Sequence, residues 1–233
     1  MNRLILIFFL LSPLSMQSHN GLCTIRKAGE NVYVSSQIDD HHEINYWFKK
    51  CMANDLFTFY RVSVTSGTTG TTVVNEAYSD NIGPFEIRGG GWCGGNHLFT
   101  DEKTQTAETF SIKLYADGQS ISSDTLLKAQ IIKLEVKNRI FNPLSAEQTG
   151  DKTYFTDTLC IENVNYTIRG NSIQVDLSHD YINRTPVIIT KYYGMQSMFK
   201  DENQLLTPLG KYPFWTNIHQ TNRFKNCLLY TSP

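Results

Sequence analysis

Residues 131–140, IIKLEVKNRI, alternate apolar with charged side chains over most of their length. A period of two is typical of a β-strand with one buried and one solvated face. Similar segments, rich in β-branched and aromatic residues, recur at 32–34, 44–48, 57–64, 72–74, 85–88, 110–115, 158–164, 166–168, 173–177 and 187–193. Turn sequences such as Asp117-Gly118 separate them. The sequence therefore predicts an all-β fold: a large two-sheet β-sandwich of the jelly-roll or Greek-key type with few helices.

Helical patterns are sparse. Residues 38–53 show some helical spacing, but the run Tyr46-Trp47-Phe48 within them favours a strand. Residues 123–130 are compatible with one helical turn. No internal repeat is visible, which disfavours a propeller or a solenoid.

Composition excludes several classes of protein. The chain has 233 residues, of which 12% are aromatic, and a net charge of -1 from 21 basic and 22 acidic side chains. Disorder requires few aromatics and a high net charge. A nucleic-acid binder requires a positive field to attract phosphates. We therefore expect a folded protein that does not bind nucleic acid.

The N-terminus predicts export. Residues 4–11, LILIFFLL, follow Arg3 and precede the more polar stretch LSMQS at 14–18. This layout is that of a secretory signal peptide, and the apolar run is too short to span a bilayer. We expect a signal peptide at 1–20, a single β-sandwich domain at 21–226, and a secreted protein without a membrane span. Residues 227–233 resemble a translated sequencing adapter, so we interpret them as a non-native tail.

Cysteine usage and glycosylation sequons fit the secretory pathway. Without Cys227, the remaining cysteines allow two disulfides in three connectivities, and the alternative is a set of buried free thiols. These four are Cys23, Cys51, Cys93 and Cys160. Sequons begin at Asn165 and Asn183, so we expect a disulfide-bonded glycoprotein.

The segment IGPFEIRGGGWCGGNHLF, at 82–99, contains five glycines between Gly89 and Gly95. Glycines weaken a strand, so their density requires a reason. The functional interpretation is a binding segment, with Trp92 as a stacking surface and Asn96, His97 and Glu86 as polar contacts. The alternative is a structural crossover in which Trp92 packs over a disulfide through Cys93.

A second candidate site follows the strand predicted at 173–177. His179 could act as a general base near neutral pH, and Tyr192, Tyr193 and Gln196 could line a sugar-sized groove. A catalytic set of His97 or His179 with Tyr192 or Tyr193 would suit β-elimination of an acidic polysaccharide. The alternative is that His179 lies in a turn and the tyrosines belong to the core.

No metal or cofactor is expected. His41 and His42 are adjacent, and adjacent residues on a strand point to opposite faces. We interpret them as part of a polar turn.

These features resemble extracellular carbohydrate-active proteins in general. The resemblance implies a secreted β-sandwich that binds an extracellular glycan or polysaccharide. Two alternatives remain: a polysaccharide-degrading enzyme, either a lyase or a glycoside hydrolase, and a secreted protein-interaction domain without a small-ligand site. The sequence does not indicate an oligomeric state.

Overall fold

The structure is a computed structural model that describes residues 21–67, 70–76, 83–194, 204–207 and 210–213. The predicted signal peptide, Gln196 and the predicted tail lie outside these residues. Within the described ranges nearly all regular structure is antiparallel strand, apart from one 3-10 turn, η1 (Pro143–Ser145). No helix in this part of the chain is long and apolar enough to cross a membrane.

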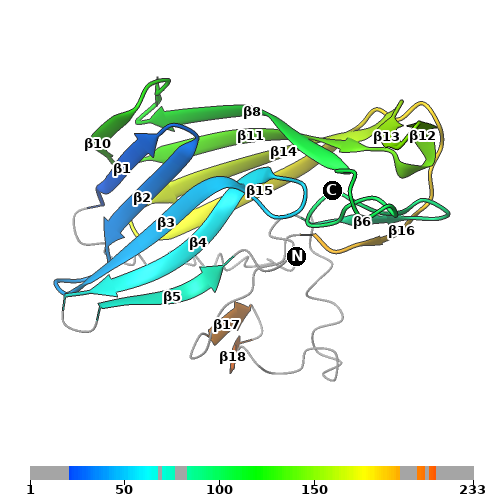
Figure 1. Cartoon of the computed structure of the whole chain (residues 1–233). Helices are drawn as coiled ribbons and strands as arrows, with labels where there is room; N and C mark the ends of the chain where they lie inside the picture. Colours follow the sequence, from blue (N-terminus) through cyan, green and yellow to red (C-terminus); the bar gives the residue numbers. More distant parts are fainter. Residues whose placement is uncertain (1–20, 68–69, 77–82, 195–203, 208–209, 214–233) are drawn as a thin grey trace, which may run out of the picture.

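Two large sheets form the body of the molecule (Figure 1). The six-stranded sheet consists, from edge to edge, of β10 (Thr125–Ala129), β1 (Cys23–Ala28), β2 (Asn31–Gln37), β3 (His42–Cys51), β4 (Leu56–Ser66) and β5 (Gly70–Glu76). The five-stranded sheet consists of β15 (Ser172–Tyr181), β14 (Thr158–Arg169), β11 (Ile132–Phe141), β8 (Ala107–Ala116) and β9 (Gln119–Ser120). The predicted all-β sandwich is confirmed, whereas a jelly-roll or Greek-key order is not confirmed.

Three smaller sheets complete the described structure. The three-stranded sheet has the order β16 (Ile189–Tyr192), β6 (Phe85–Ile87) and β7 (Gly91–Cys93). The two-stranded sheets are β12 (Ala146–Thr149) with β13 (Lys152–Phe155), and β17 (Gln204–Thr207) with β18 (Gly210–Pro213).

Neither segment with a helical pattern contains a helix, and the strand predicted at 44–48 is confirmed. Residues 123–130 contain strand β10, because pairing with β1 satisfies their backbone groups. Residues 38–53 contain strand β3, whose alternation places Tyr46 and Phe48 in the core.

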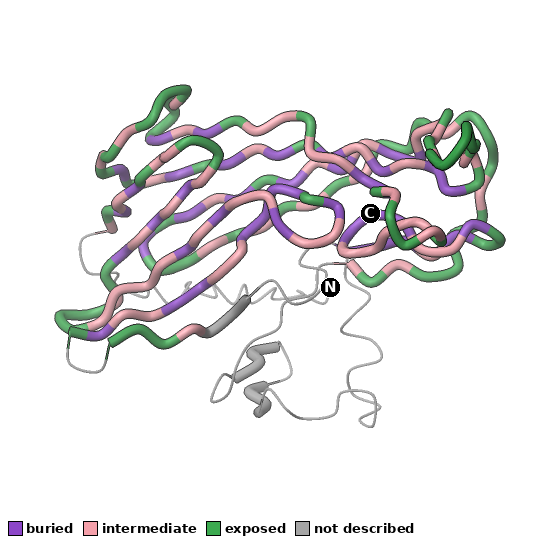
Figure 2. The backbone as a smooth tube through the Cα atoms, in the orientation of Figure 1, coloured by how far each residue is buried: buried purple, intermediate pink, exposed green. Residues whose placement is uncertain are grey.

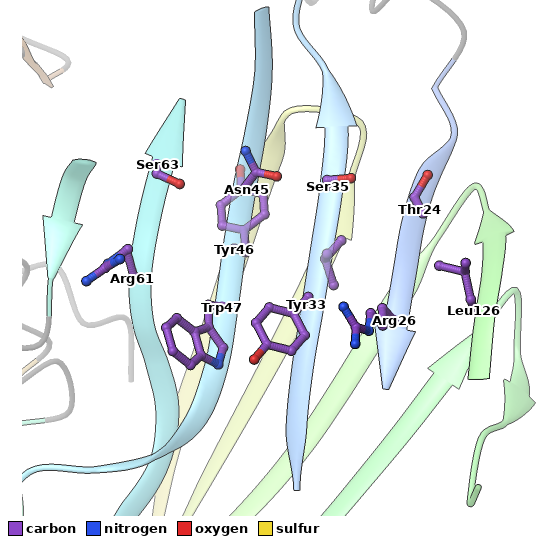
Figure 3. A pocket seen from close by; sticks show the side chains of 11 residues that line it. Thr24, Arg26, Tyr33, Ser35, Asn45, Tyr46, Trp47, Arg61, Ser63 and Leu126 are labelled. Atoms are coloured by element: carbon purple, nitrogen blue, oxygen red, sulfur yellow. The ribbon is translucent and has the colours of Figure 1, made fainter. Parts of the chain in front are cut away.

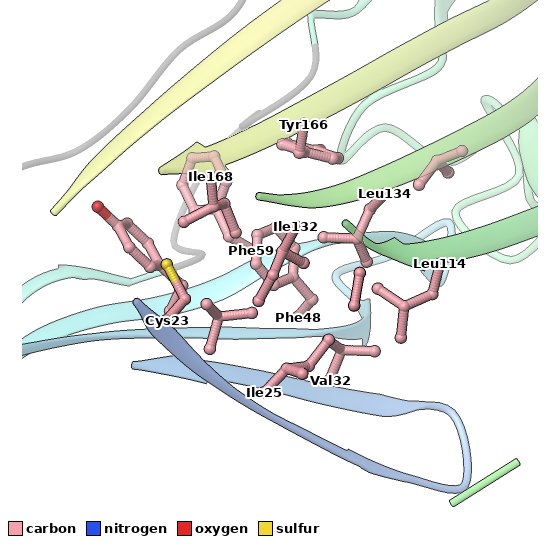
Figure 4. Packing of buried hydrophobic residues seen from close by; sticks show 14 of the residues in the cluster. Cys23, Ile25, Val32, Phe48, Phe59, Leu114, Ile132, Leu134, Tyr166 and Ile168 are labelled. Atoms are coloured by element: carbon pink, nitrogen blue, oxygen red, sulfur yellow. The ribbon is translucent and has the colours of Figure 1, made fainter. Parts of the chain in front are cut away.

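The main core lies between the two large sheets (Figure 4). Buried residues alternate with more exposed ones along β11 and β14, as expected for strands with one inner face (Figure 2). Phe48 from β3 meets Tyr166 from β14 edge to face, with ring centres 5.2 Å apart. Complete burial of such side chains stabilises the fold by about 1.5–3 kcal/mol each.

A second core lies beyond the first. Strand β14 has 12 residues, so it extends roughly 40 Å. The six-stranded sheet covers one end of its inner face, and the three-stranded sheet covers the other end (Figure 1). The residues of this second core are Leu56, Phe85, Ile87, Cys93, Ala107, Ile140, Leu159 and Cys160.

The prediction of disulfides is wrong. The described cysteines Cys23, Cys51, Cys93 and Cys160 are all free and buried. Cys23 belongs to the main core, and Cys93 and Cys160 belong to the second core. They act as small apolar side chains, so Trp92 does not pack over a disulfide.

We expect these four thiols to be unreactive in the folded protein. Burial raises the pKa of Cys93 to about 12 and that of Cys51 to about 11, and only thiolates attack thiol reagents. Mass spectrometry should find iodoacetamide on these cysteines only after unfolding in guanidinium chloride without reductant. Failure to label any of them in the unfolded, unreduced chain would show that they are paired.

Candidate functional site

The glycine-rich segment, residues 89–95, packs in the second core through Cys93. Residues 91–93 form strand β7, and four of the five glycines between Gly89 and Gly95 have positive φ. Gly94 has φ +74°, and a Cβ there would lie 3.4 Å from Ile140 Cδ1. A Cβ at Gly90 would lie 2.8 Å from Pro143 Cγ. The glycines therefore permit tight turns and close packing around a short strand.

Asn54 fixes this segment to the rest of the fold. Its side chain is 1% exposed, and its Nδ2 donates to the carbonyls of Gly95 and His97, at 2.9 Å each. Its Oδ1 accepts from the Thr106 backbone N–H at 2.8 Å. Thr106 Oγ1 accepts in turn from the Gly94 backbone N–H at 3.0 Å. These bonds satisfy backbone groups that a buried turn would otherwise leave unpaired.

Asn96 also contacts the protein. Its Oδ1 accepts a hydrogen bond from the Ala53 backbone N–H at 2.7 Å. This amide therefore helps to position the segment that precedes β4.

Four predicted site residues meet on the outer face of the three-stranded sheet. Trp92 and Glu86 are cross-strand partners, and the half-buried Trp92 indole stacks on His97 at 4.9 Å between ring centres. Tyr193 lies 5.0 Å from the same indole. Lys191 Nζ is 3.0 Å from Glu86 Oε2. The hydrogen bond from Lys191 holds the pKa of Glu86 below its usual range.

The other two described residues of the predicted catalytic set lie on the inner face. Tyr192 stacks on Phe85 at 4.8 Å, and His179 meets both rings edge to face, at 5.3 Å from Tyr192 and 5.1 Å from Phe85. Burial raises the pKa of Tyr192, and the nearby Glu162 carboxylate raises it further. The structure thus places His97 with Tyr193 and His179 with Tyr192, on opposite faces of one small sheet.

His179 ends a buried row of hydrogen bonds across the five-stranded sheet. Thr109 Oγ1 donates to Asn138 Oδ1 at 2.6 Å, and Asn138 Nδ2 donates to Glu162 Oε1 at 2.9 Å. Glu162 Oε2 lies 3.1 Å from His179 Nε2. Asn138 and Glu162 are completely buried. We call these four residues the polar row, and their polar groups satisfy one another.

A different surface carries aromatic, cationic and polar side chains, most of them half-buried: the outer face of the six-stranded sheet (Figure 3). Cross-strand partners there form two parallel rows over β1 to β4. One row has aromatic and cationic residues, and the other has hydroxyl and amide groups. The first row is Arg26, Tyr33, Trp47 and Arg61, and the second is Thr24, Ser35, Asn45 and Ser63. We call these eight residues the outer platform.

The outer platform lines a cavity of about 400 Å³. Tyr33 and Trp47 stack with ring centres 5.3 Å apart and an interplanar angle of 27°. The Trp47 indole N–H donates to Asn31 Oδ1 at 3.1 Å, which fixes the orientation of the ring. The exposed Leu126 extends the first row beyond Arg26.

The sequence interpretation missed these residues. The run Tyr46-Trp47-Phe48 was used only as evidence for a strand. The alternation of faces along that strand also predicts which of these side chains points outward. If Tyr46 and Phe48 face the core, Trp47 must face out, and the same holds for Tyr33 between two valines. An outward-facing indole beside an outward-facing phenol makes this face a second candidate surface.

Comparison with known proteins returns no match: no protein-family model, no curated protein and no solved structure matches this chain.

Replacement of Asn54 should destabilise the second core. Asn54→Ala removes the side chain that hydrogen-bonds to the carbonyls of Gly95 and His97 and to the Thr106 N–H. We expect the free energy of unfolding to fall by about 2–4 kcal/mol. Urea denaturation measures the loss. Gln148→Ala, which removes an amide from an exposed strand position, is the matched control and should change stability by less than about 0.5 kcal/mol. Equal stability of the two variants would refute the role of Asn54.

Proposed function

We propose that this chain is a secreted protein that binds an extracellular carbohydrate through the outer platform. The observation that carries the proposal is the cavity of about 400 Å³ in which Tyr33 and Trp47 lie beside Asn45 and Ser35. The C–H faces of a sugar ring are apolar and pack on aromatic rings, whereas its hydroxyls require directed polar groups. The outer platform supplies both kinds of contact in adjacent rows.

The dimensions favour a chain of sugars over a single sugar. The rows run across β1, β2, β3 and β4, and neighbouring strands are about 4.8 Å apart. The first row therefore spans roughly 14 Å from Arg26 to Arg61. An oligosaccharide lying across the strands would contact Tyr33 and Trp47 with successive rings.

Export is supported by the apolar run at 4–11 and by the position of one sequon. Asn165 is exposed on the outer face of β14. That face is on the side of the sandwich opposite the outer platform, because both sheets turn their inner faces to the main core. An N-glycan on Asn165 would leave the proposed binding surface open.

The alternative function is a polysaccharide lyase or glycoside hydrolase. The 3.1 Å contact between His179 and Glu162, with Tyr192 nearby, favours it. However, both Glu162 oxygens already have protein partners, and the His179 side chain is only 11% exposed. The raised pKa of Tyr192 also opposes its use as a base. Carbohydrate binding has the stronger support.

The third function, a protein-interaction domain, makes a different prediction. It requires no sugar contacts, so a glycan array would remain blank. The array therefore separates this function from the proposed one.

Trp47→Ala should weaken binding to glycans identified on an array at least tenfold, because stacking on the indole is lost. Tyr33→Ala should act in the same direction, and Trp47→Phe should retain most of the affinity. Biolayer interferometry measures the affinities, and circular dichroism checks that each variant is folded.

Trp92→Ala is the matched control, because this half-buried indole lies on the three-stranded sheet and is not part of the outer platform. It should bind like the original protein. The reverse pattern, with Trp92→Ala inactive and Trp47→Ala unchanged, would place the site on the three-stranded sheet.

A further inference from the structure

We infer that the glycan recognised by the outer platform is anionic and carries carboxylate or sulfate groups. This inference rests on the proposed function and adds the chemical class of the ligand. It is carried by the charges that the structure places around the two aromatic rings.

Cationic side chains flank the aromatic rings at both ends. The Arg26 guanidinium carbon lies 5.9 Å from the centre of the Tyr33 ring, and that of Arg61 lies 5.9 Å from the Trp47 ring. Lys49 Nζ lies 4.8 Å from the centre of the Trp47 ring. The row thus places two adjacent aromatic surfaces for sugar rings between groups that attract negative substituents.

No acidic residue is among the described residues that line this cavity. The charged residues that line the cavity are Arg26 and Arg61, and Glu76 on β5 is the cross-strand partner of Arg61. Arg26 therefore carries the inference. On the outer face of the five-stranded sheet, carboxylates lie directly beside the cations. Arg139 there pairs with Glu108, and Glu135 lies between Lys133 and Lys137 on β11.

Arginine suits this ligand class. Its planar guanidinium donates two parallel hydrogen bonds to a carboxylate or sulfate. Arg26 is exposed at the end of the cavity, where a substituent on a bound ring could reach it. Single-stranded nucleic acid also combines negative charge with stacking. The second row of hydroxyl and amide groups favours a ligand rich in hydroxyls.

The test uses pairs of polymers that differ only in charge. Dextran sulfate is compared with dextran, and polygalacturonate with its methyl ester, by biolayer interferometry on the full chain. We expect at least one charged member to bind about tenfold or more tightly than its neutral counterpart. The preference should decrease as NaCl is raised, because salt screens the exposed charges. The two pairs distinguish sulfate from carboxylate.

Substitution of Arg26 tests whether its guanidinium contacts the negative groups of the glycan. Arg26→Ala should reduce affinity for the charged polymer about tenfold or more, whereas Arg26→Lys should lose less. Lys133→Ala removes one exposed positive charge from the opposite outer face and is the matched control. It should bind like the original protein.

The outcomes separate the inference from the proposed function. Equal binding within each pair, or array binding to neutral glycans only, overturns the inference and leaves carbohydrate binding intact. No binding on the array or to any polymer overturns both. Equal losses in Arg26→Ala and Lys133→Ala would show a general charge effect and overturn the inference. Tighter binding to oligothymidylate than to any glycan would replace a sugar ligand with single-stranded nucleic acid.

Discussion

The polar row of Thr109, Asn138, Glu162 and His179 lies where the two hydrophobic cores of the molecule meet. On β11, Val136 belongs to the main core and Ile140 to the second core, with Asn138 between them. Burial of a carboxylate is costly unless it is hydrogen-bonded, and here each Glu162 oxygen has a cross-strand partner, Asn138 or His179. The six-stranded and three-stranded sheets can therefore pack on different ends of the same five-stranded sheet. The polar residues at the boundary between the two cores are hydrogen-bonded to one another.

The three-stranded sheet, which covers the second core, explains the glycine-rich segment in structural terms. Strands β6 and β7 are short, and residues 88–90 join them in a tight turn in which Gly89 has positive φ. Gly94, directly after β7, turns the chain against Ile140, and Asn54 satisfies the backbone groups that this turn buries. Trp92 then lies on the outer face of this cover, where it stacks on His97. The segment that looked most like a binding loop is thus also a necessary part of the core.

Much of the fold could be predicted from the sequence, because period-two alternation reports which residues share a face of a strand. It correctly indicated the long strands β8, β11 and β14 and the turn at Asp117-Gly118, where both residues have positive φ. It could not show what covers each face, since that depends on contacts between residues distant in the chain. The cysteines show the same limit: their spacing permits disulfides, but the structure places Cys23 and Cys93 in different cores. For the candidate site, the sequence pattern predicted that Trp92, His97 and Glu86 lie together, which the structure shows. The interpretation of the sequence did not include the outer platform.

Stability and the proposed binding surface use opposite faces of the same strands. Tyr33 lies between Val32 and Val34, and Trp47 lies between two aromatic residues of the main core. A shift of register by one residue would exchange the two faces, so packing of the core also fixes the positions of the outer side chains. The outer platform is therefore held in place by strands whose opposite face packs in the main core. Such a rigid surface loses little entropy when a ligand binds, and its recognition depends on the side chains that the strands present.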